Sequence, residues 1–156
     1  MKDFVHLHVH TQYSILDGQA SIPKLVDKAL KDGMRGMAIT DHGNMMGIKE
    51  FFNYVNKAKG KAKGKLAECE EKLANATPEE SPAIEKDMEA QKAVLAFKPI
   101  FGCEMYVARH SKTDMNGKED MSGYHLIVLA KNYQGYHNLI KLVSNAWTDG
   151  FYMRPR

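Results

Sequence analysis

The sequence predicts an α/β fold in which strands and helices alternate along the chain. Four short apolar stretches are typical of strands, and segments with helical periodicity separate them. Histidines and carboxylates stand at or near the ends of these strands. Because the chemistry of β/α folds gathers where strands end, the pattern favours a parallel barrel or an open sheet with a site at one edge.

The composition is that of one soluble globular domain. The 156 residues are 44% hydrophobic and 26% charged, and 22 basic against 19 acidic residues give a formal net charge of +3. This balance gives no argument for nucleic-acid binding from charge alone. Cys69 and Cys103 have no CxxC spacing, which favours a reducing cytoplasm. We expect no signal peptide, because the N-terminus runs into the first predicted strand without an apolar h-region. We also expect no membrane span, because no apolar run approaches about 18 residues.

The first predicted strand covers residues 5–10 and ends in a loop that carries Asp17. Apolar residues alternate with His6, His8 and His10, so the imidazoles share one face of the strand. Residues two apart on a strand lie roughly 7 Å apart, and two imidazoles at that spacing can bind one metal ion. His8 and His10 are the stronger candidates, because they lie nearer the end of the strand. The alternative is a solvent-exposed histidine face.

A helix is predicted between Ser21 and Gly33. Ser21 can cap its start, a proline suits the first turn, and an apolar stripe ends at the glycine. Residues 35–40 then form a short buried strand that ends at Asp41 and His42. By the same topological argument, these two side chains face the mouth where the first strand ends. Asp41 is expected beside the ligands, or alternatively as the cap of the next helix.

The next segment changes in character. A second helix is expected over roughly residues 46–58, with its aromatic residues in the core. A run rich in lysine and glycine follows, and a Glu- and Lys-rich segment continues to about Gln91. Thin apolar stripes and proline-containing helix starts predict an inserted helical hairpin over residues 60–95. The lysines are candidate phosphate contacts, but no aromatic residues are interleaved with them, which favours a solvent-exposed insertion.

Glu104 is the one acid in a third predicted strand, over residues 99–107. A carboxylate in such an apolar run must be paired, solvated or bound to a cation. Metal ligation is the interpretation that unites Glu104 with the histidines, and an edge-strand glutamate facing water is the alternative.

The pattern ends with a polar loop over residues 111–122, a fourth strand over residues 124–130 and a helix over residues 132–147. His125 opens the fourth strand and is the weakest candidate ligand by position. The ending is rich in aromatic and basic residues, so we expect the natural protein to continue beyond Arg156.

Four motifs carry a family resemblance, and they occur in family order: HLHVHTQYSILDG, ITDHGNM, FKPIFGCEMYVA and GYHLIVLAKNYQGYHNLIKLVSNAW. The sequences of these motifs resemble those of the polymerase and histidinol phosphatase (PHP) family, and in particular its members at the N-terminus of bacterial DNA polymerase III alpha subunits. The resemblance covers residues 1–156 as the N-terminal portion of a PHP domain, apart from an insertion at about 57–97.

The resemblance implies a distorted seven-stranded β/α (TIM-like) barrel with a trinuclear metal cluster at its C-terminal mouth. The remaining part of the barrel, a further His or Cys ligand and a late Asp-x-His motif would lie beyond Arg156. The positions that match the family's ligands are His8, His10, Asp17, His42, Glu104 and His125. Imidazole and carboxylate ligands favour zinc, manganese or iron over calcium, while the parent polymerase would use magnesium.

The implied activity is metal-dependent phosphoester hydrolysis, as a phosphatase or a 3′–5′ exonuclease. It would act within a DNA-directed DNA polymerase, a nucleotidyltransferase of DNA replication with DNA and replisome subunits as partners. The alternative is a non-catalytic module that braces the polymerase. A free-standing small-molecule phosphatase is disfavoured, because the motif sequences are so similar to those of the polymerase subunits. Unpaired barrel strands also predict that this chain self-associates, and a monomer by light scattering would contradict that.

Overall fold

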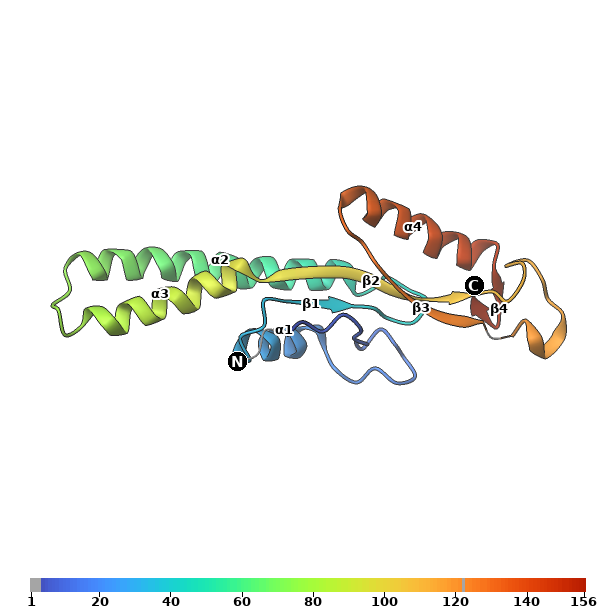
Figure 1. The fold of residues 1–156 in the computed structure, drawn as a ribbon, viewed down its shortest axis with the longest axis horizontal. Helices are drawn as coiled ribbons and strands as arrows, with labels where there is room; N and C mark the ends of the chain where they lie inside the picture. The colour runs from blue at the N-terminus through green and yellow to red at the C-terminus, as the bar shows by residue number, and fades with distance from the viewer. Residues whose placement is uncertain (1–3, 122) are drawn as a thin grey trace.

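Three strands form the central sheet, in the order β1 (Gly36–Ile39), β2 (Lys98–Val107) and β3 (Tyr124–Leu129). This is seen in a computed structural model that describes residues 4–121 and 123–156 (Figure 1). Residues 1–3, expected to lead into the first strand, and Ser122, expected at the end of the polar loop, lie outside the described residues. The predicted α/β class is therefore confirmed.

The direction of β3 corrects the expectation of an all-parallel sheet. β1 and β2 are parallel, whereas β2 and β3 are antiparallel. A parallel neighbour needs a long crossover, usually a helix, but a loop with only one short 3-10 turn, η1 (Gly117–Glu119), joins β2 to β3. The chain therefore folds straight back on itself. The seven-stranded barrel is not confirmed by the sheets of residues 4–121 and 123–156.

The first predicted strand forms only a single bridge to β1, between His6 and Met37. The segment is held by the Ala38 N–H, which donates to the His6 carbonyl at 2.8 Å. Farther along, the Thr40 N–H donates to the Val9 carbonyl at 2.8 Å. The Val9 N–H donates to the Thr40 hydroxyl at 2.9 Å, so it cannot extend the backbone pairing between the strands. The expectation of a strand over residues 5–10 is corrected to an extended segment.

The helix α1 (Ile22–Lys31) confirms the prediction between Ser21 and Gly33. Ser21 occupies the N-cap position, but its side chain makes no cap hydrogen bond. The Ile22 N–H instead donates to the Gln12 side chain at 3.1 Å. The apolar face of α1 packs against β1 and the start of the next helix, and this contact makes the larger core cluster, whose buried members are Ile22, Val26, Ala29, Met37, Ile39, Ile48, Phe51, Val55 and Phe97.

The helix α2 (Ile48–Ala74) is much longer than predicted. It was expected to end near Ala58, yet it continues through the lysine-rich run. Gly60 and Gly64 each weaken a helix interior by about 1 kcal/mol relative to alanine, but α3 (Ser81–Ala96) packs along the same stretch and buries Ala62. The two helices form the expected hairpin as an arm that points away from the sheet (Figure 1).

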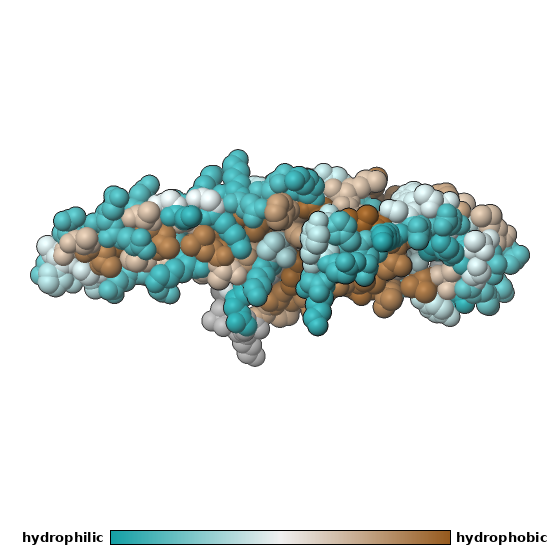
Figure 2. Space-filling model, turned by 90° about the horizontal axis from the view of Figure 1, so that it is seen from above, coloured by the Kyte–Doolittle hydropathy of each residue, from teal (hydrophilic) through white to brown (hydrophobic). Residues whose placement is uncertain are grey.

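The arm is a polar structure with little core of its own. None of the side chains of α3 is buried. On the face seen in Figure 2, apolar residues gather over the middle of the molecule, whereas its two ends are largely hydrophilic. No helix in the described part of the chain is long and apolar enough to cross a membrane.

The helix α4 (Tyr133–Thr148) covers one face of β2. The Asn132 side chain caps its start by accepting from the Gly135 N–H at 2.8 Å. Leu139 and Val143 pack against β2 and form a second buried cluster with Cys103 and Met105. A small hairpin that the sequence did not predict follows, formed by β4 (Phe151–Tyr152) and β5 (Arg154–Pro155).

Candidate metal centre

The alternation of side chains along β2 separates the core from the candidate site. Cys103 and Met105 point toward α4 and are buried in the second cluster. Glu104 and Tyr106 therefore face the other side of the sheet. On that side His125 of β3 lies directly opposite Tyr106. β2 and β3 thus bring an acid and a histidine to one surface.

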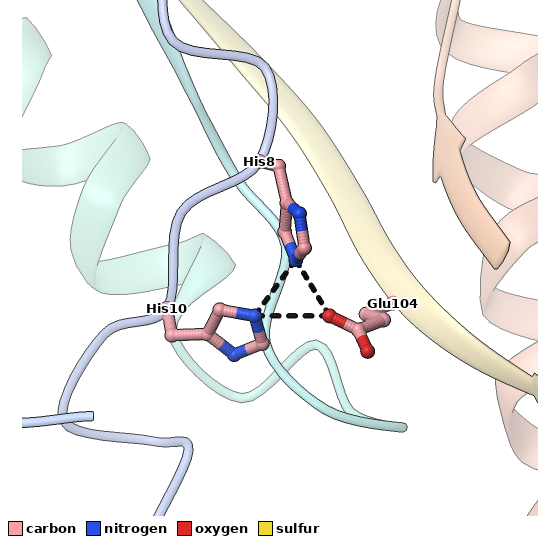
Figure 3. A group of neighbouring side chains, drawn as sticks. All are labelled: His8, His10 and Glu104. Carbon is pink, nitrogen blue, oxygen red and sulfur yellow. Dashed lines mark hydrogen bonds and ion pairs between the residues drawn. The ribbon is translucent and has the colours of Figure 1, made fainter. Parts of the chain in front are cut away.

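Glu104 is the centre of this surface. Its side chain is only 4% exposed. Its Oε2 atom lies 2.6 Å from His8 Nε2 and 2.9 Å from His10 Nε2. The two imidazole nitrogens are themselves 2.8 Å apart, so these three atoms form a tight triangle (Figure 3).

The second carboxylate oxygen of Glu104 faces two more histidines. His125 Nδ1 contacts Oε1 closely, and His42 Nδ1 lies 3.4 Å from the same oxygen. Among the described residues, His42 Nδ1 is buried without a hydrogen-bond partner. On the opposite side of its ring, His42 Nε2 lies 3.0 Å from Asp17 Oδ2.

All six predicted ligands come together in three overlapping groups, within each of which the candidate ligand atoms lie within 4.8 Å of one another. The groups are His8, His10 and Glu104; His10, Asp17 and His42; and His42, Glu104 and His125. Metal binding by these residues remains a prediction. His6 belongs to none of the groups, is exposed, and packs edge-on against Phe4, as its lower ranking implied.

The electrostatics favour ionised carboxylates at this surface. Burial would raise the pKa of Glu104, but the hydrogen bonds to His125 and His8 and the charge interactions with His42 and His10 together hold the pKa below its usual value. A hydrogen bond from His42 likewise lowers the pKa of Asp17. Cys103 behaves in the opposite way, because burial raises the pKa of its thiol to about 12. The thiol therefore stays protonated and is unsuited to bind a metal.

Asp41 neither caps α2, whose N-cap is Gly47, nor lies in any of the three groups. Its buried carboxylate holds the loop after His10 instead. It accepts hydrogen bonds from the Thr11 N–H at 2.6 Å, the Thr11 hydroxyl at 2.8 Å and the Ser14 hydroxyl at 2.7 Å. Sequence reasoning missed Thr11 and Ser14, because a hydroxyl in a polar loop carries no pattern of its own.

Tyr106 was also missed, although its position two residues after Glu104 places it on the same face of the strand. Its ring stacks on His42 with centroids 6.1 Å apart and meets His125 edge-on at 4.9 Å. Arg154 of β5 donates to the Tyr106 hydroxyl at 2.9 Å. The C-terminal hairpin is thereby tied to the candidate metal centre.

Known proteins match nearly the whole length of the chain. The sequence profile of the family described as PHP domain matches residues 6–156. The chain is 39% identical over 155 residues to the DNA polymerase III subunit alpha of Borreliella burgdorferi strain B31, covering 98% of this chain and 10% of that protein. The corresponding protein of Treponema pallidum strain Nichols is 38% identical over 156 residues, with 98% and 10% covered. That of Aquifex aeolicus strain VF5 is 34% identical over 161 residues, with 99% and 11% covered.

The chain thus spans about a tenth of the length of these relatives. The family match, by contrast, extends over nearly all of its residues and includes all four motifs that bring the candidate ligands together. The chain belongs to the PHP domain family.

Proposed function

We propose that His8, His10, Asp17, His42, Glu104 and His125 bind divalent metal ions and that the domain hydrolyses phosphoesters. One observation carries the proposal: both oxygens of a single buried carboxylate are faced by imidazole nitrogens, two on each oxygen. A glutamate in this position is suited to bridge neighbouring ions.

The contacts among these groups are best satisfied by cations. His8 Nε2 and His10 Nε2 lie 2.8 Å apart and both approach the same oxygen of Glu104. A hydrogen atom can serve only one of these close pairs at a time, whereas a cation attracts all three ligand atoms together. The unpartnered Nδ1 of His42 beside the other oxygen has the same explanation. Mixed imidazole and carboxylate ligands suit zinc, manganese or iron.

When bound at such a site, divalent ions activate water near neutral pH and neutralise the charge of a phosphoryl group. The chain's own residues would hold these ions at a fixed geometry. Glu104 is set by the sheet and is buried, while the side chains of His8 and Asp17 are 53% and 57% exposed. The site is therefore closed toward the core and open along His8 and Asp17, where a phosphoester could enter.

We further propose that the chain works in DNA replication, as part of a DNA-directed DNA polymerase. The support is the identity of the relatives, which are DNA polymerase III alpha subunits. In that setting the phosphoester would be DNA, the reaction would resemble a 3′–5′ exonuclease, and the other partners would be replisome subunits. The polymerase reaction itself would use magnesium.

A structural role is the second candidate, and one feature of the fold favours it. The Trp147 indole N–H at the end of α4 donates to the Gly43 carbonyl at 2.8 Å, next to His42. Metal binding to His42 would therefore stabilise the contact between the C-terminal part of the chain and the first half of the sheet. In this alternative the ions brace the domain and no hydrolysis occurs.

Elemental analysis tests the metal site first. The chain is stripped of metal, reloaded separately with zinc and manganese, and compared with His8→Ala and His6→Ala. We expect stoichiometric metal in the wild type, loss in His8→Ala, and no change in His6→Ala, because His6 lies outside the three groups. Equal binding in all three proteins, or none in the wild type, would contradict the proposed ligands.

Hydrolysis then separates the two functions. The metal-loaded chain is incubated with single-stranded DNA labelled at its 5′ end, and shortening from the 3′ end is followed on a gel. Metal-dependent shortening that His8→Ala abolishes and His6→Ala retains supports catalysis. Stoichiometric metal that raises the unfolding temperature, without any shortening, supports the bracing role.

A further inference from the structure

The Ser14 hydroxyl lies beneath the candidate metal centre and contacts three polar groups. Its residue is 2% exposed. The Oγ atom lies 2.7 Å from Asp41 Oδ1, 3.0 Å from His10 Nδ1 and 3.2 Å from the backbone nitrogen of His42. A serine hydroxyl has one hydrogen to donate and two lone pairs to accept with. Three contacts therefore use its whole hydrogen-bonding capacity.

The direction of each hydrogen bond follows from this count. Asp41 is 2% exposed and already accepts from the Thr11 N–H and the Thr11 hydroxyl, so it is an acceptor toward Ser14 as well. The single hydrogen of Ser14 thus goes to Asp41. The backbone N–H of His42 can only donate, and it takes one lone pair of Ser14 Oγ. The remaining lone pair faces His10 Nδ1.

We propose that Ser14 is a positioning residue that holds His10 in the tautomer protonated on Nδ1. Only that tautomer offers a hydrogen to the remaining lone pair of Ser14. This tautomer leaves a free lone pair on His10 Nε2, the nitrogen that lies beside His8 Nε2 and Glu104 Oε2. Histidines that bind metals commonly have the other ring nitrogen fixed by a hydrogen bond in this way. Here the buried carboxylate of Asp41 acts on His10 through Ser14.

The backbone of Ser14 makes separate hydrogen bonds that shape the loop around the site. The Ser14 N–H donates to the Thr11 carbonyl at 2.9 Å, and the Gly18 N–H donates to the Ser14 carbonyl at 2.7 Å. His10 precedes this turn, and Asp17 lies within it. Loss of the hydroxyl should therefore release the His10 ring without removing the backbone bonds that shape the loop.

The tautomer is tested by NMR on the metal-free, ¹⁵N-histidine-labelled 156-residue chain at about pH 8. The His10 signals are identified by their loss in His10→Gln. We expect Nδ1–H in the wild type and a shift toward Nε2–H in Ser14→Ala. Ser21→Ala is the matched control, because the Ser21 side chain makes no cap hydrogen bond, and it should keep the wild-type tautomer. Nε2–H in the wild type, or an unchanged tautomer in Ser14→Ala, would overturn the proposal.

Zinc titration gives a second readout, which rests on the proposed function. We expect Ser14→Ala to weaken zinc binding by about 10–100-fold, as for other partners of metal ligands, and Ser21→Ala to leave it unchanged. A tautomer shift in a chain that binds no zinc would reject the metal site but support the role of Ser14. If Ser14→Ala binds zinc with the wild-type affinity and keeps the wild-type tautomer, the metal site is supported and the role of Ser14 is rejected.

The conservative variant covers the case in which Ser14→Ala fails to fold. Ser14→Thr keeps the hydroxyl, so a folded variant should retain the Nδ1–H tautomer of His10. Circular dichroism establishes that it is folded. A folded Ser14→Thr with His10 protonated on Nε2 would overturn the proposal.

Discussion

Gly43 and Pro155 lie in direct contact, although they are 112 positions apart in the sequence. A Cβ atom placed on Gly43 would come within 2.7 Å of Pro155 Cγ. Gly43 also has a φ of 59°, in the left-handed region that favours glycine. The residue after His42 is therefore fixed both by its own backbone and by the C-terminal hairpin.

Gly43→Ala should destabilise the chain. The left-handed backbone costs a non-glycine residue about 1–3 kcal/mol, and the new methyl group displaces β5. We expect the free energy of unfolding in urea to fall by at least this amount. Gly60→Ala is the matched control, because nothing lies within 4 Å of its added Cβ in α2. The free energy of unfolding of that variant should rise by about 0.5–1 kcal/mol, because alanine has a higher helix propensity than glycine. Equal effects of the two variants would contradict the prediction.

Glu104 should make stability depend on pH. Its pKa is lowered in the folded chain, because the hydrogen bonds to His125 and His8 and the charge interactions with His42 and His10 together outweigh burial. A carboxyl with a lowered pKa stabilises the fold above its unfolded value of about 4.3, and this contribution is lost as the pH falls through the folded pKa. In urea unfolding without metal, the free energy of unfolding of Glu104→Gln should therefore fall furthest below that of the wild type at pH 6, and the difference should be smaller at pH 3.

The control for this pH series is Glu85→Gln. Glu85 is exposed on α3, and its side chain makes no hydrogen bond or ion pair to any residue in 4–121 or 123–156. Its substitution should leave unfolding unchanged at both pH values. If the loss of unfolding free energy in Glu104→Gln grows as the pH falls, the pH dependence has the wrong sign and the prediction is contradicted.

Trp147 should report metal binding, because it is the single tryptophan of the chain and hydrogen-bonds to the residue after His42. A shift of the His42 loop on zinc addition changes the environment of the indole. We expect a saturable change in tryptophan fluorescence with zinc, and its loss in His42→Ala. His137→Ala, an exposed histidine outside the three groups, should retain the signal. Retention of the full signal in His42→Ala would count against the predicted ligand.

Self-association should occur through the free edge of β3. This strand pairs with β2 on one side only among the described strands, and Leu126 is 54% exposed on it. Unpaired strand edges pair with other chains, and a charge on the edge suppresses this. Light scattering at high concentration should therefore show dimers or larger species, with fewer in Leu126→Lys. A wild-type chain that stays monomeric would refute the prediction.

The sequence by itself determined several of the elements and which residues to examine. Period-two alternation placed Glu104 on one face of β2, and helical spacing predicted α1 and α4 near their observed limits. The histidine motif singled out His8 and His10 above His6. These signals are local, because each depends on residues a few positions apart that share a face of one element.

Tertiary structure alone decided how these pieces meet. The antiparallel direction of β3 and the continuation of α2 past Ala58 depend on contacts with distant segments. The same holds for Ser14, whose role follows from Asp41, 27 residues away. A hydroxyl shows its donors and acceptors only once the chain has folded around it, because hydrogen bonding depends on distance and direction in space and leaves no periodic pattern along the sequence.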